Sequence, residues 1–389
     1  MNKRGLSVLR PCLFLVACLQ ATQSAAKNFS TIPLNEWPMI MCHDAATTYL
    51  NKSLLSAEVY DWTITQPEKV GVEGLLSCGA RGFDWRPLLT DSELYMHHGS
   101  IPVKYPMALA VREMVEWSNA NPNPEDLVVL GVTACSGDGC ADAAKKVLKD
   151  AGVSFINDCS VLKDFTVADA LQKGQLQGGG HLLATFDCWQ GNYVPANTCS
   201  GYDTSKERSL MDGKSTFPCI PADVDPAAPF AELMPSQRHE LFECSRALRQ
   251  RTEGAQSAHF FGSARSLLSS SPQTQAEGIP KPYTCYTDSS TKELPVNRMM
   301  AYLQKVADEG PPADGRLYTY QALWQEDASS VVLGILHGSS LLEDEERSGL
   351  NSLVTAQVLR GSYPSINFME VNNVCDGGLD LLAALRSRL

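Results

Sequence analysis

Two short stretches in the first hundred residues carry side chains that could bind an anion and move protons. The segment 79–99 is typical of two strands joined by a polar turn, with Asp84 and Arg86 in the first strand and His97-His98 ending the second. Residues two apart in a strand face the same side, so Asp84 and Arg86 should lie together. A guanidinium that holds a phosphate ester and an imidazole that transfers a proton would suit phosphodiester chemistry. The alternative is a surface Asp–Arg ion pair on a hairpin beside an exposed histidine.

An apolar run just upstream ends in a second histidine. Residues 37–42 predict a buried strand, and His43 and Asp44 follow it directly. A single histidine at a strand end is more often structural than catalytic. Two strands that each end in histidine, with aspartate and arginine close by, favour a site.

The residues in these stretches form a pattern. His43-Asp44 is followed by Gly-x-Arg-x-Phe-Asp-x-Arg at 79–86, Leu-Thr-Asp at 89–91 and His-His-Gly at 97–99. This order resembles the X domain of phosphatidylinositol-specific phospholipase C, closest to its bacterial, metal-independent branch. The resemblance covers His43 to Gly99 and weakens beyond it to an alternation of strands and helices. It implies a secreted phosphoric diester hydrolase with no cofactor and no metal.

The resemblance also implies roles for the matching residues. His43 would be the general base on the inositol 2-hydroxyl and His98 the general acid, with His97 as its competitor. Asp44 would pair with the acid histidine, and Arg86 would hold the phosphate where calcium sits in the animal branch. Further candidates are Asp84 to orient Arg86 or bond a loop, Glu370 on the last strand to support His43, and Asp187 and Tyr320 to contact substrate.

Two departures from the bacterial pattern leave the head group open. The bacterial members carry lysines after the strand equivalent to 127–132, where this chain has Thr133-Ala134-Cys135. They carry an arginine on the strand equivalent to 181–186, where this chain has Asp187 at the end. Substrates in view are phosphatidylinositol, a glycosylated inositol lipid anchor, or another phosphodiester.

The rest of the chain alternates apolar runs with helical periodicity, which predicts an α/β fold of the TIM-type (β/α) barrel, distorted or incomplete. Expected strands are 126–134, 181–187, 316–325 and 365–374, and expected helices are 106–119, 140–151, 167–172, 295–308, 329–359 and 377–389. Residues 193–281 break this rhythm and are expected to form a cysteine-containing insertion, with helices near 236–250 and 255–268. Its histidines, His239 and His259, are assigned to surface or structural positions. The acidic run 343–346 is assigned to a solvated helix face rather than a metal site.

Residues 1–26 are typical of a secretory signal, with a basic start, a short apolar run and small residues at 24–26. The barrel domain is therefore expected to span 27–389, outside the cell. Sequons at 28–30 and 51–53 are candidate glycosylation sites.

The cysteine content agrees with export, because 11 of the 13 cysteines lie beyond the leader. Cys135 and Cys140 flank a turn and are expected to pair. Cys188 with Cys199 is the second expected pair, and Cys42 is the candidate free thiol.

The net charge of −12 argues against nucleic acid and against bulk adsorption to anionic lipid, so any transient membrane-surface contact must be local. Two other functions remain open. A metal-dependent glycerophosphodiesterase or phospholipase D-like enzyme would need acidic magnesium ligands near the histidines. A non-catalytic secreted binding protein could use the same barrel.

Overall fold

The fold is taken from a computed structural model that describes residues 29–91, 93–190, 233–244, 285–286, 296–326, 331–332, 335 and 338–389. Residues 1–28, which include the expected signal segment and the sequon asparagine at 28, lie outside the described residues, as do His259 and most of the expected insertion 193–281. Residues 235–244 are helical and overlap the helix expected near 236–250.

A central sheet of eight parallel strands organises the molecule. Its order is β7-β8-β6-β2-β1-β13-β11-β9, so the first and last strands of the chain are neighbours at its centre. The strands are β1 (Met39–Cys42), β2 (Gly82–Trp85), β6 (Val128–Val132), β7 (Ser154–Ile156), β8 (Leu182–Phe186), β9 (Trp189–Gln190), β11 (Leu317–Gln321) and β13 (Phe368–Val371). A small parallel pair joins β10 (Cys285–Tyr286) to β12 (Trp324–Gln325).

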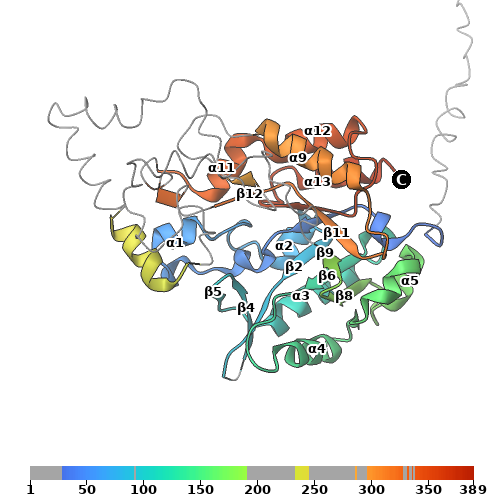
Figure 1. Ribbon diagram of the computed structural model, residues 1–389. Helices are drawn as coiled ribbons and strands as arrows, with labels where there is room; N and C mark the ends of the chain where they lie inside the picture. The colour runs from blue at the N-terminus through green and yellow to red at the C-terminus, as the bar shows by residue number, and fades with distance from the viewer. Residues whose placement is uncertain are drawn as a thin grey trace, which may run out of the picture.

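Helices follow the strands and cover them, as Figure 1 shows, with α3, α4 and α5 on one side and α9, α12 and α13 on the other. The α-helices with printed bounds are α1 (Ala57–Asp61), α2 (Gly71–Ser77), α3 (Met107–Ala120), α4 (Cys140–Asp150), α5 (Val167–Lys173), α9 (Val296–Glu309), α11 (Leu341–Ser348), α12 (Leu350–Leu359) and α13 (Gly378–Arg386). Short 3₁₀ turns are η1 (Leu34–Glu36), η2 (Ala45–Tyr49), η3 (Lys52–Leu54), η4 (Pro124–Asp126) and η5 (Cys159–Asp164). None of the described helices is long and apolar enough to cross a membrane.

The sheet curls around an apolar interior. Alternate residues of the strands, among them Met41, Val129 and Phe368, form one buried cluster inside the curl, and the intervening residues form a second cluster under the helices. The interior is so tight at Gly82 that a Cβ atom there would lie 2.8 Å from the Phe368 ring. Among the described strands, β7 and β9 are not hydrogen-bonded to each other. The architecture is therefore the predicted TIM-type barrel, left open between these two strands.

The segment after β2 differs from the expected pair of strands. β2 belongs to the barrel, and the antiparallel hairpin that follows is a separate sheet of β3 (Pro87–Leu89), β4 (Leu94–His98) and β5 (Ile101–Val103). The chain turns at Arg86 between the two sheets, so Asp84 and His98 come from different sheets that meet at one edge.

The expected helix 329–359 is divided in two at Gly349, whose φ of 62° is in the left-handed region. The assignment of the acidic run 343–346 to a solvated face is wrong for its two central residues. Asp344 and Glu345 are 0% and 1% exposed. Asp344 accepts hydrogen bonds from Ser339 and Arg347, which compensate its charge.

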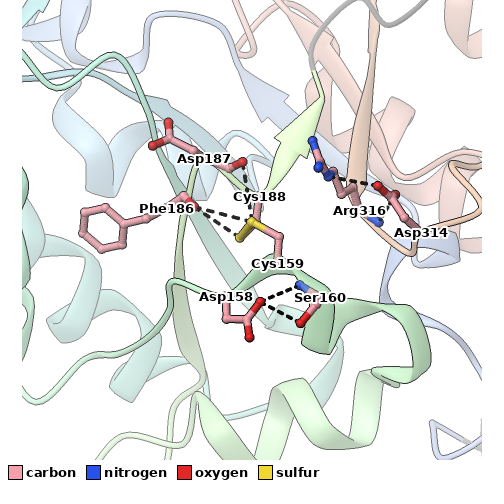
Figure 2. Close-up of a disulfide and its surroundings, with 8 residues drawn as sticks. All are labelled: Asp158, Cys159, Ser160, Phe186, Asp187, Cys188, Asp314 and Arg316. Atoms are coloured by element: carbon pink, nitrogen blue, oxygen red, sulfur yellow. Dashed lines mark hydrogen bonds and ion pairs between the residues drawn. A yellow bond between two sulfur atoms is a disulfide. The ribbon is translucent and has the colours of Figure 1, made fainter.

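Three disulfides lie in the described residues. The expected pair Cys135–Cys140 is confirmed, and Cys42 is a buried free thiol as expected. The predicted partner of Cys188 was wrong, because Cys188 bonds Cys159 (Figure 2). Cys188 follows β8 and Cys159 follows β7, and these parallel neighbours bring the two cysteines together at their ends.

The disulfide Cys78–Cys375 joins the end of α2 to the loop after β13, across 297 residues of sequence. Because a cross-link over a long loop restricts the unfolded chain most, replacing both cysteines with serine should lower the free energy of unfolding by about 3–5 kcal/mol. Urea unfolding measures this loss. The control is the serine pair at Cys135 and Cys140, only five residues apart in sequence, which should cost less. An equal cost for both pairs would contradict the loop-length argument.

Candidate functional site

The six residues expected to do chemistry meet at the C-terminal ends of the barrel strands. His43 and Asp44 follow β1, Asp84 lies in β2 and Arg86 follows it, His98 ends β4, and Glu370 lies in β13. Five of them are at most 3% exposed, and Arg86 is half-buried with its side chain 24% exposed. In a TIM-type barrel this is the face on which loops and strand ends build the site.

Asp44 stands at the centre of the cluster. Its Oδ2 lies 3.2 Å from His43 Nε2 and 3.1 Å from His98 Nε2, and its Oδ1 lies 2.9 Å from Arg86 Nη1. Burial by itself raises the pKa of Asp44, but Arg86 and the two histidines outweigh it and hold the pKa below its usual value of 3.8. Asp44 therefore stays ionised and ties the three groups together.

Arg86 is held by a second carboxylate. Its Nη2 and Nε lie 2.6 and 3.3 Å from the two oxygens of Asp84, while the Asp84 Oδ2 also accepts from the Asp44 backbone N–H at 3.3 Å. The side chains of Asp44 and Asp84 are 1% and 0% exposed. The alternative of a surface ion pair on a hairpin is therefore wrong, because Arg86 lies between two buried carboxylates.

Both histidines are held in one tautomer by groups outside the cluster. His98 Nδ1 lies 2.9 Å from the Thr63 carbonyl oxygen, which can only accept a hydrogen bond. His43 Nδ1 lies 2.9 Å from Asn372 Oδ1. Each ring therefore carries a hydrogen on Nδ1 and directs Nε2 at Asp44. Contact of an Nε2 with the Asp44 carboxylate is favourable only when that nitrogen is protonated.

The pKa of His98 is lowered by its burial, an effect that Asp44 opposes and Arg86 reinforces. A phosphate anion bound beside Arg86 would add negative charge and favour the protonated imidazole. The acid form is thus strengthened when an anionic substrate is present.

Asn372, not Glu370, makes the direct contact with His43. Residues 41 and 370 pair between β1 and β13, so His43 is level with Asn372. Glu370 lies two residues earlier along β13, deeper in the barrel, where it is opposite Gln321 of β11. Burial raises the pKa of Glu370 to about 7. Glu370 is therefore a buried acid beneath the histidine rather than its partner.

Three other candidates, His97, Asp187 and Tyr320, make no side-chain hydrogen bond or ion pair with the cluster. His97 bonds the backbone oxygens of Gly99 and Ala134 at 2.7 and 2.9 Å, and so ties β4 to the loop after β6. Asp187 is exposed at the end of β8.

The substrate role expected of Tyr320 does not fit its position. Tyr320 points out of the barrel, because Thr319 and Gln321 take the inner positions of β11. It is fully buried under the helices, where its hydroxyl donates to the Ser365 carbonyl oxygen.

Several site residues were not predicted from sequence. Gln66 donates through Nε2 to the backbone oxygens of His43 and Val371, at 3.1 and 2.9 Å, and so fixes the ends of β1 and β13 side by side. Thr63 and Asn372 hold the imidazoles. A signal existed for Asn372, since it lies two positions after Glu370 and so on the same face of the strand.

One donor set in the described residues could be considered for a metal ion. Ligand atoms of His43, Asp84 and Glu370 all lie within 4.8 Å of one another and are buried. The fit is poor, because Asp84 is already paired with the guanidinium of Arg86, whose positive charge would oppose a cation.

No protein-family profile matches the chain, and no curated protein sequence matches it. Among solved structures, the chain is similar to a phosphatidylinositol-specific phospholipase C from Listeria monocytogenes, with 10% identity and a TM-score of 0.43 over 92% of this chain and 96% of that one. A variant of the phosphatidylinositol-specific phospholipase C from Staphylococcus aureus gives 10% identity and a TM-score of 0.46 over 92% and 95%.

Proposed function

We propose that the chain is a metal-independent phosphodiesterase of phospholipase C type, acting on an inositol phospholipid or a related phosphodiester. The observation that carries the proposal is the approach of two imidazole Nε2 atoms to one carboxylate oxygen, at 3.2 and 3.1 Å, beside a guanidinium. An acid, a base and an anion-binding group in one cluster are what phosphodiester cleavage by an internal hydroxyl needs.

The proposed reaction follows from the fixed tautomers. The bound inositol 2-hydroxyl replaces Asp44 as the neighbour of His43 Nε2, and the neutral imidazole takes the hydroxyl proton while that oxygen bonds phosphorus. The bond from phosphorus to the glycerol oxygen breaks, and the leaving oxygen takes the proton from His98 Nε2. Arg86 faces the phosphoryl oxygens as their negative charge grows. The products are a cyclic inositol phosphate and a diacylglycerol.

Neutral and acidic groups at the ends of β6 and β8 suit a head group without further phosphates. The loop after β6 offers Thr133 and Ala134, and the end of β8 offers Asp187. A carboxylate at that edge would repel an additional phosphate, whereas hydroxyl groups could bond to it. The proposed substrate is therefore unphosphorylated phosphatidylinositol or its glycosylated form.

Secretion and brief contact with a membrane surface belong to the same proposal. Three disulfides in the described residues support an oxidising compartment, and a lipid substrate must be met at its surface.

The second candidate is a metal-dependent diesterase, for which the three buried donors His43, Asp84 and Glu370 are the observation and the Arg86–Asp84 ion pair is the counter-argument. Chelation separates the two. With Arg86 in the cation's place, EDTA should change the rate by less than about twofold, as expected when the charge on phosphate is met by a side chain. Loss of activity in EDTA, restored by Mg²⁺ or Ca²⁺, would favour the second candidate.

The test of the proposal is hydrolysis of phosphatidylinositol vesicles by the purified chain in EDTA, followed by phosphorus NMR. A cyclic phosphodiester signal that appears before any monoester is the expected result. Release of a free inositol with phosphatidic acid would indicate phospholipase D chemistry. No turnover with any inositol lipid, with or without metal, would favour the binding-protein alternative.

A further inference from the structure

A buried carboxylate outside the barrel connects to the proposed base through one side chain. Glu345 of α11 is 1% exposed, and its Oε2 accepts from the Trp324 backbone N–H at 3.2 Å and from Asn372 Nδ2 at 3.3 Å. Asn372 Nδ2 also donates to the Trp324 carbonyl oxygen at 2.7 Å. On its other side, Asn372 Oδ1 lies 2.9 Å from His43 Nδ1.

These contacts decide which way the Asn372 amide points. In the opposite orientation the Asn372 oxygen would face the Trp324 carbonyl oxygen, which has no hydrogen to donate. It would also face Glu345 Oε2, which already acts as an acceptor for the Trp324 N–H. Both amide hydrogens are used only when the nitrogen faces Trp324 and Glu345. The oxygen must then face His43, and the hydrogen of the neutral imidazole stays on Nδ1.

We propose that Glu345 is a positioning residue that acts through Asn372 to keep His43 Nε2 free to accept a proton. The inference rests on the proposed function for its catalytic meaning, while the imidazole tautomer itself is a property of the folded protein. Glu345 touches neither substrate nor the reacting atoms.

Glu345 has a role that its neighbour Asp344 lacks. Asp344 is equally buried on the same helix, but it bonds Ser339 Oγ at 2.6 Å and Arg347 Nη2 at 2.9 Å. Burial raises the pKa of Glu345 to about 8, and either protonation state leaves one carboxyl oxygen as an acceptor. Glutamine at position 345 should therefore keep the acceptor for Asn372 Nδ2, whereas leucine should remove it.

The experiment compares Glu345→Leu, Glu345→Gln and Asp344→Asn by ¹⁵N-detected NMR of the histidine rings and by turnover of phosphatidylinositol. Glu345→Leu should give His43 a mixture of tautomers and lower kcat by about 10- to 100-fold with little change in KM, as other outer contacts that orient an imidazole do. Glu345→Gln should keep the Nδ1–H tautomer and recover kcat to within about threefold. Asp344→Asn controls for loss of a buried carboxylate from α11 and should leave the His43 tautomer unchanged.

An unchanged His43 tautomer in folded Glu345→Leu would overturn the proposal, and so would equal effects of the leucine and glutamine variants. If Glu345→Leu does not fold, Glu345→Met provides the test, because methionine matches the length of glutamate but offers no carboxyl oxygen to Asn372 Nδ2 or to the Trp324 N–H. It should show the same mixture of His43 tautomers and the same loss of kcat as predicted for leucine. An unchanged His43 tautomer in Glu345→Met would overturn the inference.

The NMR measurement also separates the two claims. A fixed tautomer that depends on Glu345, in a protein that cleaves no inositol lipid, would keep the positioning role and reject the proposed function. Turnover of an inositol lipid by a protein whose His43 tautomer does not depend on Glu345 would keep the proposed function and reject the positioning role.

Discussion

Replacing His43 or His98 with alanine should lower kcat for phosphatidylinositol by about 10³-fold each, with the protein still folded. The size of this rate loss is that expected when a positioned acid or base is removed. Among the described side chains, only these two imidazoles place a nitrogen within 3.2 Å of Asp44 Oδ2, so neither has a substitute. Initial rates with vesicles, and circular dichroism of each variant, measure the two parts of this prediction.

The leaving group distinguishes the base from the acid. A 4-nitrophenyl ester of inositol phosphate needs little protonation of its leaving oxygen, so His98→Ala should recover most of its activity on that substrate. His43→Ala should not recover, because the 2-hydroxyl still needs a base.

His97→Ala is the matched control for the adjacent histidine. Its ring bonds the backbone oxygens of Gly99 and Ala134, so the variant should lose stability more than chemistry. Recovery of His97→Ala, and not of His98→Ala, on the activated ester would show that the acid was assigned to the wrong histidine.

The sequence carried much of this site because its residues are close together in the chain. The alternation rule predicted that Asp84 and Arg86 share one face of a strand, and the structure places both at the inner edge of the barrel. The pattern of strands and helices predicted the fold class for the same reason, since hydrophobic periodicity is a local property.

Contacts that depend on the closure of the barrel could not be predicted in this way. Asn372 reaches His43 across 329 residues of sequence, because the first and last strands pair. The alignment of Cys159 with Cys188 likewise depends on which strands are neighbours. The hydrogen bond to His43 Nδ1 comes from Asn372, two residues after Glu370 on the same face of the strand, because the register between β1 and β13 makes residue 372 level with residue 43.

Burial was the second quantity beyond reach. The acidic run 343–346 resembles a solvated helix face in composition, yet Glu345 is 1% exposed and bonds Asn372. A charged residue is rarely buried without partners, and the partners here come from β12 and the end of β13. Only the fold could reveal them.

Arg86→Lys should lower kcat/KM by about 10²- to 10³-fold, the second large effect expected in this site. The guanidinium bridges two carboxylates, with contacts of 2.9 Å to Asp44 and of 2.6 and 3.3 Å to Asp84. A lysine ammonium is a compact point charge without the planar fork of a guanidinium, and it cannot bond both carboxylates while it faces a phosphate. Steady-state kinetics on phosphatidylinositol measure the loss.

Arg81→Lys is the matched control, because Arg81 directly precedes β2 as Arg86 directly follows it, and it also pairs with an aspartate. It bonds Asp126 through Nε and Nη2 at the opposite end of the barrel. Its replacement should lower stability and leave kcat/KM within about threefold, since distant sites are nearly independent. Equal kinetic losses in both variants would mean that the barrel, and not phosphate binding, is what Arg86 supports.

Removing the charge altogether, in Arg86→Met, should change how stability depends on pH. In the natural protein the pKa of Asp44 is held below 3.8, so its ionised form stabilises the fold above that pH, and the contribution is lost as the pH falls below it. Without Arg86, only the histidines oppose the effect of burial, and we expect the folded-state pKa of Asp44 to rise above its unfolded value. The variant should then lose stability as the pH rises through that higher value, and its deficit relative to the natural protein should be smallest near pH 4, which urea unfolding between about pH 4 and 8 measures. A deficit that stays constant over this range would show that Asp44 keeps its charge without Arg86.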